Sequence, residues 1–306
     1  MVGKVYGYAD VGRFGLGHGL LAWGRCVVWC HDRGEPVIAP RWLRVRVGPY
    51  LRRERDKRFY FRHFCTGRQV GGLRRAQLLA LAQKLSAETE LPETGWVPAR
   101  DTVVVFRNSP ADNERKHFHE IVGASAVVRE ALREMTRSRF IPPPPREPQI
   151  AIHVRGGDFS SPGSIDVLKS GRHNYRLPIT WYIEMLTGLR KMLDVEMPAV
   201  VYSDCMDDEL APLLTLARVT RSPYREAITD MHAMSDARVL ISSGSGFSRW
   251  GSYLGQVPRL CFPGQRTVRT LQALGAIDLE PECETAADIS AAFCQCIIQR
   301  ASLGTI

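Results

Sequence analysis

Short apolar runs alternate with helical periodicities along the second half of the chain. Runs with strand character lie at 150–154, 199–202, 238–241 and 257–262, helical patterns lie at 180–193, 207–217 and 226–236, and a further helix opens within 242–250. Strands that alternate with helices form parallel sheets with helices on their faces. The pattern therefore predicts a doubly wound α/β domain.

The first half opens with a related pattern. A strand is predicted at Val5–Ala9 and an apolar helix from Leu20 to about His31, with a glycine-rich loop between them that contains Gly12, Arg13 and Gly15. A strand, a glycine loop and a helix in this order can present backbone N–H groups to an anion. A plain turn is the alternative, because these glycines do not match the dinucleotide-binding fingerprint.

A proline run separates the two halves. Four consecutive prolines at 142–145 follow a predicted helix at about 120–137. Proline cannot continue a helix and favours an extended linker. We expect an N-terminal domain at 1–141, a linker at 142–148, a C-terminal domain at 149–285 and a terminal helix at 286–306.

Positive charge is concentrated in one stretch of the N-terminal domain. The stretch 41–75 holds twelve Lys and Arg residues against two Asp and Glu, a balance of +10, whereas the whole chain carries +9. It also holds six aromatic residues (Trp42, Tyr50, Phe59, Tyr60, Phe61 and Phe64). Such a stretch suits an anionic membrane, an anionic substrate or nucleic acid. A solvated excursion of the domain is the alternative. We favour the membrane or a lipid-linked pyrophosphate, because no nucleic-acid-binding module accompanies the charge.

The strand at 150–154 leads into the main candidate site. His153, Arg155 and Asp158 lie at or just after its carboxyl end, and Gly156 and Gly157 stand between them. Ligands of open α/β sheets bind beyond the carboxyl ends of the strands. There, Arg155 can bind a phosphate with two hydrogen bonds. A buried strand that ends in an ordinary loop ion pair is the alternative.

Two further segments supply candidate ligands at the same edge. The loop at 242–248 contains Ser243 and Ser245, whose hydroxyl and N–H groups can bind phosphate at a helix start. Arg249 adds a cation or faces solvent. Asp204 ends a strand and either faces the ligand or caps the next helix. The pair Asp207-Asp208 is interpreted as helix capping rather than as a metal site.

Several of these segments resemble one enzyme superfamily. The sequence His153–Asp158 resembles the H-x-R-x-x-D signature of the α-1,2-, α-1,6- and protein-O-fucosyltransferases. The segments 176–182 and 201–204 resemble those that follow it in bacterial α-1,2-fucosyltransferases, and 230–235 with 242–249 resembles the third motif. The resemblance covers roughly 148–262. Gly12, Arg13 and Gly15 match an N-terminal loop of the same superfamily, near donor and acceptor.

The resemblance implies a GT-B fold, in which two Rossmann-like domains face each other across a cleft. It implies that His153 lies near the nucleotide and that Asp230 binds the nucleoside, although Asp230 as a helix cap is the alternative. An acidic residue after the motif arginine serves as base in the α-1,6 branch. Asp158 and Asp166 are the nearest carboxylates here, Asp158 more as a loop anchor and Asp166 as a candidate base.

Two departures limit the resemblance. The α-1,2 enzymes carry a second arginine directly after the first, and here that position is Gly156. The superfamily's Asn-Gln pair in the N-terminal loop is Leu16-Gly17 here, so a role that depends on the Asn does not transfer. Donor identity and linkage are therefore left open.

The sequence thus predicts an inverting glycosyltransferase that needs no metal or other cofactor. The expected partners are GDP-fucose and a cell-surface or exopolysaccharide oligosaccharide, with peripheral contact to an anionic membrane through Arg41–Arg75 and no nucleic acid. A transferase for another nucleotide sugar, a nucleic-acid or anionic-surface binding protein and a non-catalytic relative are the alternatives. No run approaches the roughly 20 apolar residues that span a bilayer, and no signal-peptide pattern is present. Because Golgi members of the superfamily are anchored, we expect a cytoplasmic, bacterial enzyme with reduced cysteines.

Overall fold

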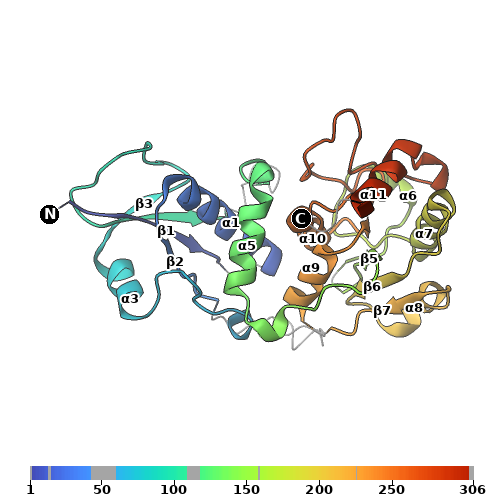
Figure 1. Ribbon diagram of the computed structural model, residues 1–306, viewed down its shortest axis with the longest axis horizontal. Helices are drawn as coiled ribbons and strands as arrows, with labels where there is room; N and C mark the ends of the chain where they lie inside the picture. The colour runs from blue at the N-terminus through green and yellow to red at the C-terminus, as the bar shows by residue number, and fades with distance from the viewer. Residues whose placement is uncertain are drawn as a thin grey trace. The chain divides into compact units, whose positions relative to one another are not determined.

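The computed structural model describes residues 2–12, 15–42, 60–108, 118–157, 159–224 and 226–302. The chain divides into two compact units, with the boundary between Ile141 and Pro142. Each unit is an α/β body around its own parallel sheet (Figure 1). The prediction of two Rossmann-like α/β domains is confirmed.

Unit 1 contains a four-stranded parallel sheet in the order β2-β1-β4-β3. Its elements are β1 Val5–Asp10, α1 Leu16–Arg33, β2 Val37–Ile38, η1 Tyr60–Arg62, α3 Gly72–Leu81, β3 Gln83–Ser86, β4 Thr102–Arg107, η2 Val122–Ala124, α5 Ser125–Met135 and η3 Ser138–Phe140. Helix α1 is buried along most of its length, with Leu20, Trp23 and Cys26 inaccessible to solvent. Gly7 of β1 lets this helix approach, because a Cβ atom there would collide with the Cys26 and Cys30 thiols.

Unit 2 contains a five-stranded parallel sheet in the order β7-β6-β5-β8-β9. Its elements are β5 Ile150–Val154, α6 Ile165–Lys169, α7 Ile179–Leu193, β6 Ala199–Ser203, α8 Asp207–Leu214, β7 Val219–Arg221, α9 Ala227–Ser235, β8 Val239–Ser242, α10 Gly246–Gly255, β9 Arg259–Cys261, η4 Ala286–Asp288 and α11 Ala291–Ser302. Every residue of β5 is buried. A strand covered on both faces reads as a continuous apolar run, which explains why the sequence pattern revealed it.

Two core clusters cover the two faces of this sheet. One joins β5 and β6 to α7 and α11, through residues such as Ile152, Leu186 and Phe293. The other joins Ala151 and Leu240 to helix α9. The terminal helix α11 is therefore part of the core of unit 2.

Several elements differ from the sequence prediction. Helix α6 of unit 2 and β2, α3, β3 and β4 of unit 1 were not predicted, and α11 begins at Ala291 rather than at 286. Strand β7 was missed, because only Val219 of its three residues is buried and so short a run gives no alternating pattern. The helix predicted at 207–217 ends at Leu214. The other strands and helices of the second half lie within a few residues of their predicted positions.

The basic stretch 41–75 falls only partly within the described residues, since 43–59 lie outside them. In the described part, Tyr60 and Phe64 are buried. The Tyr60 hydroxyl accepts a hydrogen bond from the Leu16 N–H at 3.1 Å, and Phe64 lies 4.5 Å from Trp42 between ring centroids. Tyr60 and Phe64 therefore belong to the core of unit 1, whereas Phe61 is 45% exposed. The role of the whole stretch in binding a partner stays a prediction.

The eight cysteines are all free thiols, and all except Cys65 are buried. Within the described residues, no helix combines the length and apolar character that a bilayer span requires.

Candidate functional site

The strand order of unit 2 reverses between β5 and β8, which are neighbours in the sheet. From β5 the chain moves outward through β6 to β7, then returns to β8 and β9 on the other side of β5. The loops after β5 and β8 therefore leave the sheet in opposite directions. Open α/β sheets bind ligands at such a switch point, outside the carboxyl ends of the strands. Both predicted segments, 153–158 and 242–248, begin there.

His153 and Ser243 join the ends of these two strands. The His153 Nδ1 atom lies 2.7 Å from the Ser243 hydroxyl, and the Ser243 N–H donates to the His153 carbonyl at 3.1 Å. Both residues are buried. Burial, and secondly the nearby Arg155 charge, lower the pKa of His153 to about 3. His153 is therefore a neutral hydrogen-bonding group at neutral pH.

The serine loop after β8 is fixed by side chains. Ser245 caps α10, its hydroxyl accepting from the Phe247 N–H at 3.2 Å, while its own N–H donates to the Ser243 hydroxyl at 3.3 Å. The hydroxyls of Ser242 and Ser248 lie 2.9 Å apart below the loop. The N-terminus of α10 thus has a fixed position next to His153, and the helix dipole makes it favourable for an anion.

Arg155 follows β5 directly and is paired with Asp204 after β6. Its Nη1 lies 2.5 Å from Asp204 Oδ2, and the Gly156 N–H donates to Asp204 Oδ1 at 2.8 Å. The two side chains are 24% and 28% exposed, so this pair remains accessible to a ligand. The alternative of Asp204 as the cap of α8 is wrong, because the cap position is Met206, whose N–H is bonded by Glu209.

The two glycines after Arg155 are required by the same neighbours. A Cβ atom at Gly156 would collide with the Cys205 thiol, and one at Gly157 would collide with Asp204 Oδ2. Gly157 also has a φ of 22°. The Asp204-Cys205 pair therefore occupies the space of both missing side chains. This contact explains why position 156 is a glycine, and sequence reasoning missed it because the contact joins segments that follow two different strands.

Asp230 lies in the first turn of α9. Its Oδ1 accepts a hydrogen bond from the Ser222 hydroxyl at 2.6 Å, and the same hydroxyl accepts from the Tyr224 N–H at 3.2 Å. The cap position of α9 is Glu226 rather than Asp230. Asp230 contributes, after burial, to a raised pKa of Tyr202. Its carboxylate is thus held at the carboxyl ends of β6 and β7, beside two tyrosines.

The remaining candidates of this unit are more scattered. Arg249 is 1% exposed and donates to the Thr267 hydroxyl, so the alternative that it faces solvent is wrong. Asp166 is exposed in the first turn of α6. Asp158 lies outside the described residues. Gln265, which the sequence did not single out, is buried against Gly244 and donates to the carbonyls of Leu168 and Arg172 at 2.7 and 3.0 Å.

The glycine loop of unit 1 follows β1, which lies between β2 and β4 in the sheet. Gly12 has a φ of 61°, and Gly15 is the cap residue of α1 without a side-chain cap. The helix begins at Leu16, four residues before the predicted start, so Leu16 and Gly17 are helical rather than part of the loop. Arg13 lies outside the described residues.

No group of three or more His, Cys, Asp or Glu side chains is arranged to hold a metal ion within the described ranges. The groups brought together at the edge of unit 2 are an ion-paired arginine, a neutral histidine, serine hydroxyls and a helix N-terminus. All of these are suited to binding an anion.

No protein-family model matches the chain, and no curated protein matches it. Three solved structures illustrate what it is similar to. NodZ α-1,6-fucosyltransferase soaked with GDP-fucose has 14% identity, covers 85% of this chain and 95% of its own, and gives a TM-score of 0.49. A mutant of Arabidopsis thaliana FUT1 in complex with GDP has 12% identity, coverages of 85% and 71% and a TM-score of 0.45. POFUT1 in complex with GDP-fucose has 12% identity, coverages of 84% and 97% and a TM-score of 0.42. Likeness at this level does not decide activity.

Proposed function

We propose that this protein is an inverting glycosyltransferase of the GT-B type that transfers fucose from GDP-fucose to an oligosaccharide. The observation that carries the proposal is the switch point of unit 2. There Arg155, the His153–Ser243 pair and the N-terminus of α10 lie together, as binding a diphosphate requires. The resemblance of 148–262 to fucosyltransferases supports the choice of donor.

The reaction breaks the bond between the anomeric carbon and the β-phosphate oxygen. The acceptor hydroxyl oxygen bonds to the anomeric carbon from the opposite face, and the leaving GDP takes the bonding electrons. Negative charge therefore grows on the β-phosphate. Arg155 and the donors of the serine loop would stabilise this charge, because they are held in place before the reaction begins.

The carboxylates would have separate roles. Asp230 would accept hydrogen bonds from the guanine N1–H and amino group, since a carboxylate accepts two parallel bonds. The acceptor proton would go to a carboxylate, with Asp166 as the candidate base and Asp158 as an anchor of the motif loop. Gly12, Arg13 and Gly15 of unit 1 would contribute on the acceptor side.

We propose that the reaction needs no metal ion, because fixed cationic and backbone donors can supply the charge that a metal would supply. Activity is expected to survive EDTA. Complete loss with EDTA that Mg²⁺ or Mn²⁺ restores would contradict this part of the proposal.

The experiment that tests the donor compares GDP, UDP and dTDP in thermal shift assays, followed by hydrolysis of the matching sugar nucleotides. We expect GDP to stabilise the protein most and GDP-fucose to be hydrolysed. Preference for UDP or dTDP would indicate another nucleotide sugar. GDP binding without any turnover would indicate a non-catalytic relative.

A further inference from the structure

The outer face of helix α3 in unit 1 is apolar. Leu73 is 84% exposed and Leu81 is 80% exposed, the highest values among the exposed large hydrophobic residues of the described ranges. Between them, Ala76, Gln77 and Ala80 are also exposed. These five positions share one side of a helix, because they follow Leu73 by three, four, seven and eight residues. Gln77 is the polar member of these five, and the exposed Arg74 lies at the edge of the face next to Leu81.

The opposite face of α3 already packs on the sheet. Leu78 is buried in a cluster with Tyr6 and Val103, and Leu79 and Ala82 pack against the same cluster. A helix on the surface of a protein normally turns polar residues to solvent. Helix α3 is instead apolar on both sides, so its outer face needs a partner.

The charge around α3 indicates which partner. No Asp or Glu occurs from Tyr60 to Ala87, a range that includes Arg62, Arg68, Arg74, Arg75 and Lys84. Two of these cations pair with acids elsewhere in the unit, Arg68 with Glu134 and Arg74 with Asp101. The Arg68 side chain is 84% exposed against 32% for Glu134, and Arg74 is 51% exposed against 33% for Asp101. Both cations are thus more exposed than the acids that pair with them.

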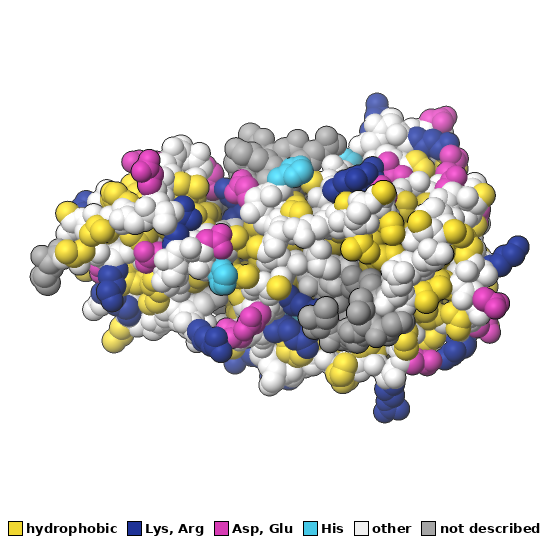
Figure 2. Space-filling view, turned by 45° about the horizontal axis from the view of Figure 1, so that its top comes forward, with side chains coloured by type: hydrophobic (Ala, Val, Ile, Leu, Met, Phe, Trp, Pro, Cys, Tyr) yellow, Lys and Arg dark blue, Asp and Glu magenta, His cyan; other side chains and the backbone are white. Residues whose placement is uncertain are grey.

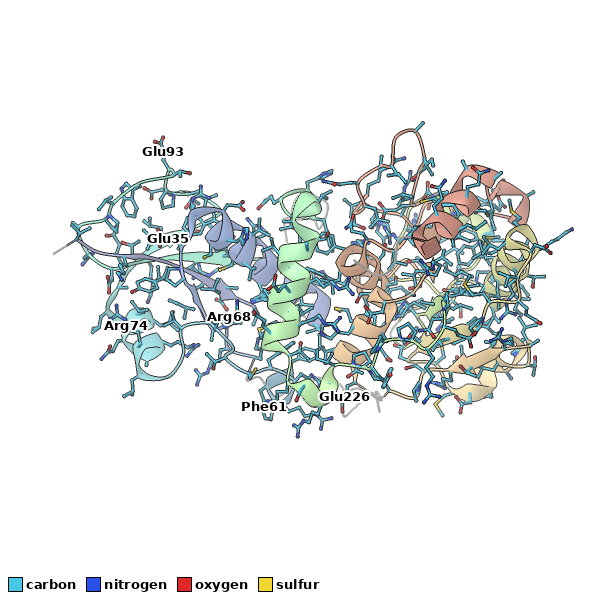
Figure 3. All side chains as sticks on the ribbon, viewed as in Figure 1. Glu35, Phe61, Arg68, Arg74, Glu93 and Glu226 are labelled. Atoms are coloured by element: carbon cyan, nitrogen blue, oxygen red, sulfur yellow. The ribbon has the colours of Figure 1, made fainter. Side chains whose placement is uncertain are left out.

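The surface views agree with this description. Hydrophobic, Lys or Arg and Asp or Glu side chains are intermixed on the surface of unit 1 (Figure 2). Arg74 lies on α3 itself, whereas Glu93 lies on a loop well away from it (Figure 3). Contact between two copies of this face would bring like charges together, which disfavours a symmetric dimer.

We propose that the outer face of α3 docks on an anionic lipid surface. Leu73 and Leu81 enter the boundary between headgroups and acyl chains, while Arg68, Arg74 and Lys84 contact lipid phosphates. The lipid contact would keep the enzyme near a membrane-bound acceptor, and only this purpose rests on the proposed function. Vesicle binding itself needs no donor and no turnover.

The test measures binding of the full-length chain to phosphatidylcholine vesicles with and without phosphatidylglycerol. We expect binding only when the anionic lipid is present. The double variant Leu73→Ser/Leu81→Ser should bind at least about tenfold more weakly, because each leucine loses the free energy of burying its side chain. The matched control is Leu274→Ser/Ile298→Ser in unit 2, where the replaced side chains are 53% and 51% exposed. It should bind like the parent protein.

A gain-of-binding variant makes the test independent of folding defects. Gln77→Leu completes the apolar face and should strengthen binding severalfold, whereas Gln77→Glu should weaken it. Equal binding of the parent and the double serine variant would overturn the proposal, as would equal binding to neutral vesicles. The proposal would also be overturned if the parent protein is dimeric in solution while the double serine variant is monomeric and still binds vesicles. The face would then be a contact with a second copy of the chain. Loss of GDP-fucose hydrolysis has no bearing on these outcomes.

Discussion

At the carboxyl edges of the two sheets, different contacts hold the loops in place. Both edges have a strand, a loop with glycines and a helix in this order. In unit 2 the loop is tied by side chains, from His153 to Ser243 and from Ser245 to the start of α10. In unit 1 the corresponding helix α1 follows Gly15, which has no capping side chain, and the Leu16 N–H donates instead to the Tyr60 hydroxyl. The same local order of elements thus gives one edge with fixed side-chain donors and one with a glycine cap.

This difference indicates which edge is better suited to stabilise a negative charge that develops during a reaction. Donors that are already held in place stabilise a developing anion without a further cost of reorganisation. Unit 2 has such donors and a paired cation in Arg155. This contrast supports the proposal that the nucleotide diphosphate binds at the edge of unit 2 and the acceptor at the edge of unit 1.

The largest effect is expected for Arg155→Ala. Loss of one fixed donor to a developing anion typically lowers the rate by about 10²–10³. We expect that loss in donor hydrolysis and transfer, measured at saturating donor. The control is Arg218→Ala, which removes an exposed cation of the same unit that pairs with Glu147. Retention of more than about a tenth of the activity would show that Arg155 does not hold the phosphate.

The fit between the two loops of unit 2 is tested at Gly156. Because a Cβ atom there meets the Cys205 thiol, Gly156→Ala should destabilise the protein by about 1–3 kcal/mol. Cys205→Ala in the same chain removes the thiol and should restore part of that loss. The check is a double-mutant cycle from urea unfolding. Additive effects of the two substitutions would mean that the two side chains do not compete for the same space.

The burial of His153 predicts how stability depends on pH. Its pKa in the folded protein, about 3, lies below the ordinary value of 6.5. The unfolded chain therefore binds the proton first as pH falls, and stability present above pH 6.5 is lost toward the folded-state value. Between pH 6.5 and pH 5 the loss should be about 2 kcal/mol. His153→Gln should flatten this part of the profile in thermal unfolding, and an unchanged slope would argue against a buried neutral histidine.

The smallest expected effects come from exchanging the caps. Ser245→Ala should cost about 1 kcal/mol of stability, because α10 loses the acceptor for the Phe247 N–H. Gly15→Ser should instead stabilise unit 1 by a few tenths of a kcal/mol. A Cβ atom at Gly15 meets nothing within 4 Å, so the new side chain has space. Thermal unfolding measures both, and a destabilised Gly15→Ser variant would mean that the glycine is needed for another reason.

The sequence by itself determined the elements with strong local patterns. The apolar runs at β5, β6, β8 and β9 and the helices between them were found, because a strand buried on both faces and a helix with an apolar side each have their own periodicity. It also determined which residues follow those strands, and hence that His153, Arg155 and Asp204 lie at the carboxyl edge of the sheet. The proline run marked a division of the chain for a similar local reason.

Only the tertiary structure decided which of these residues meet. The pairing of Arg155 with Asp204, the fit of Cys205 against Gly156 and the burial of Arg249 join segments far apart in the chain. The burial of Tyr60 and Phe64 was likewise decided by tertiary contacts, since the sequence shows only that they belong to the basic stretch 41–75. Strand order and side-chain packing set these contacts, and neither leaves a periodic signal in the residues themselves.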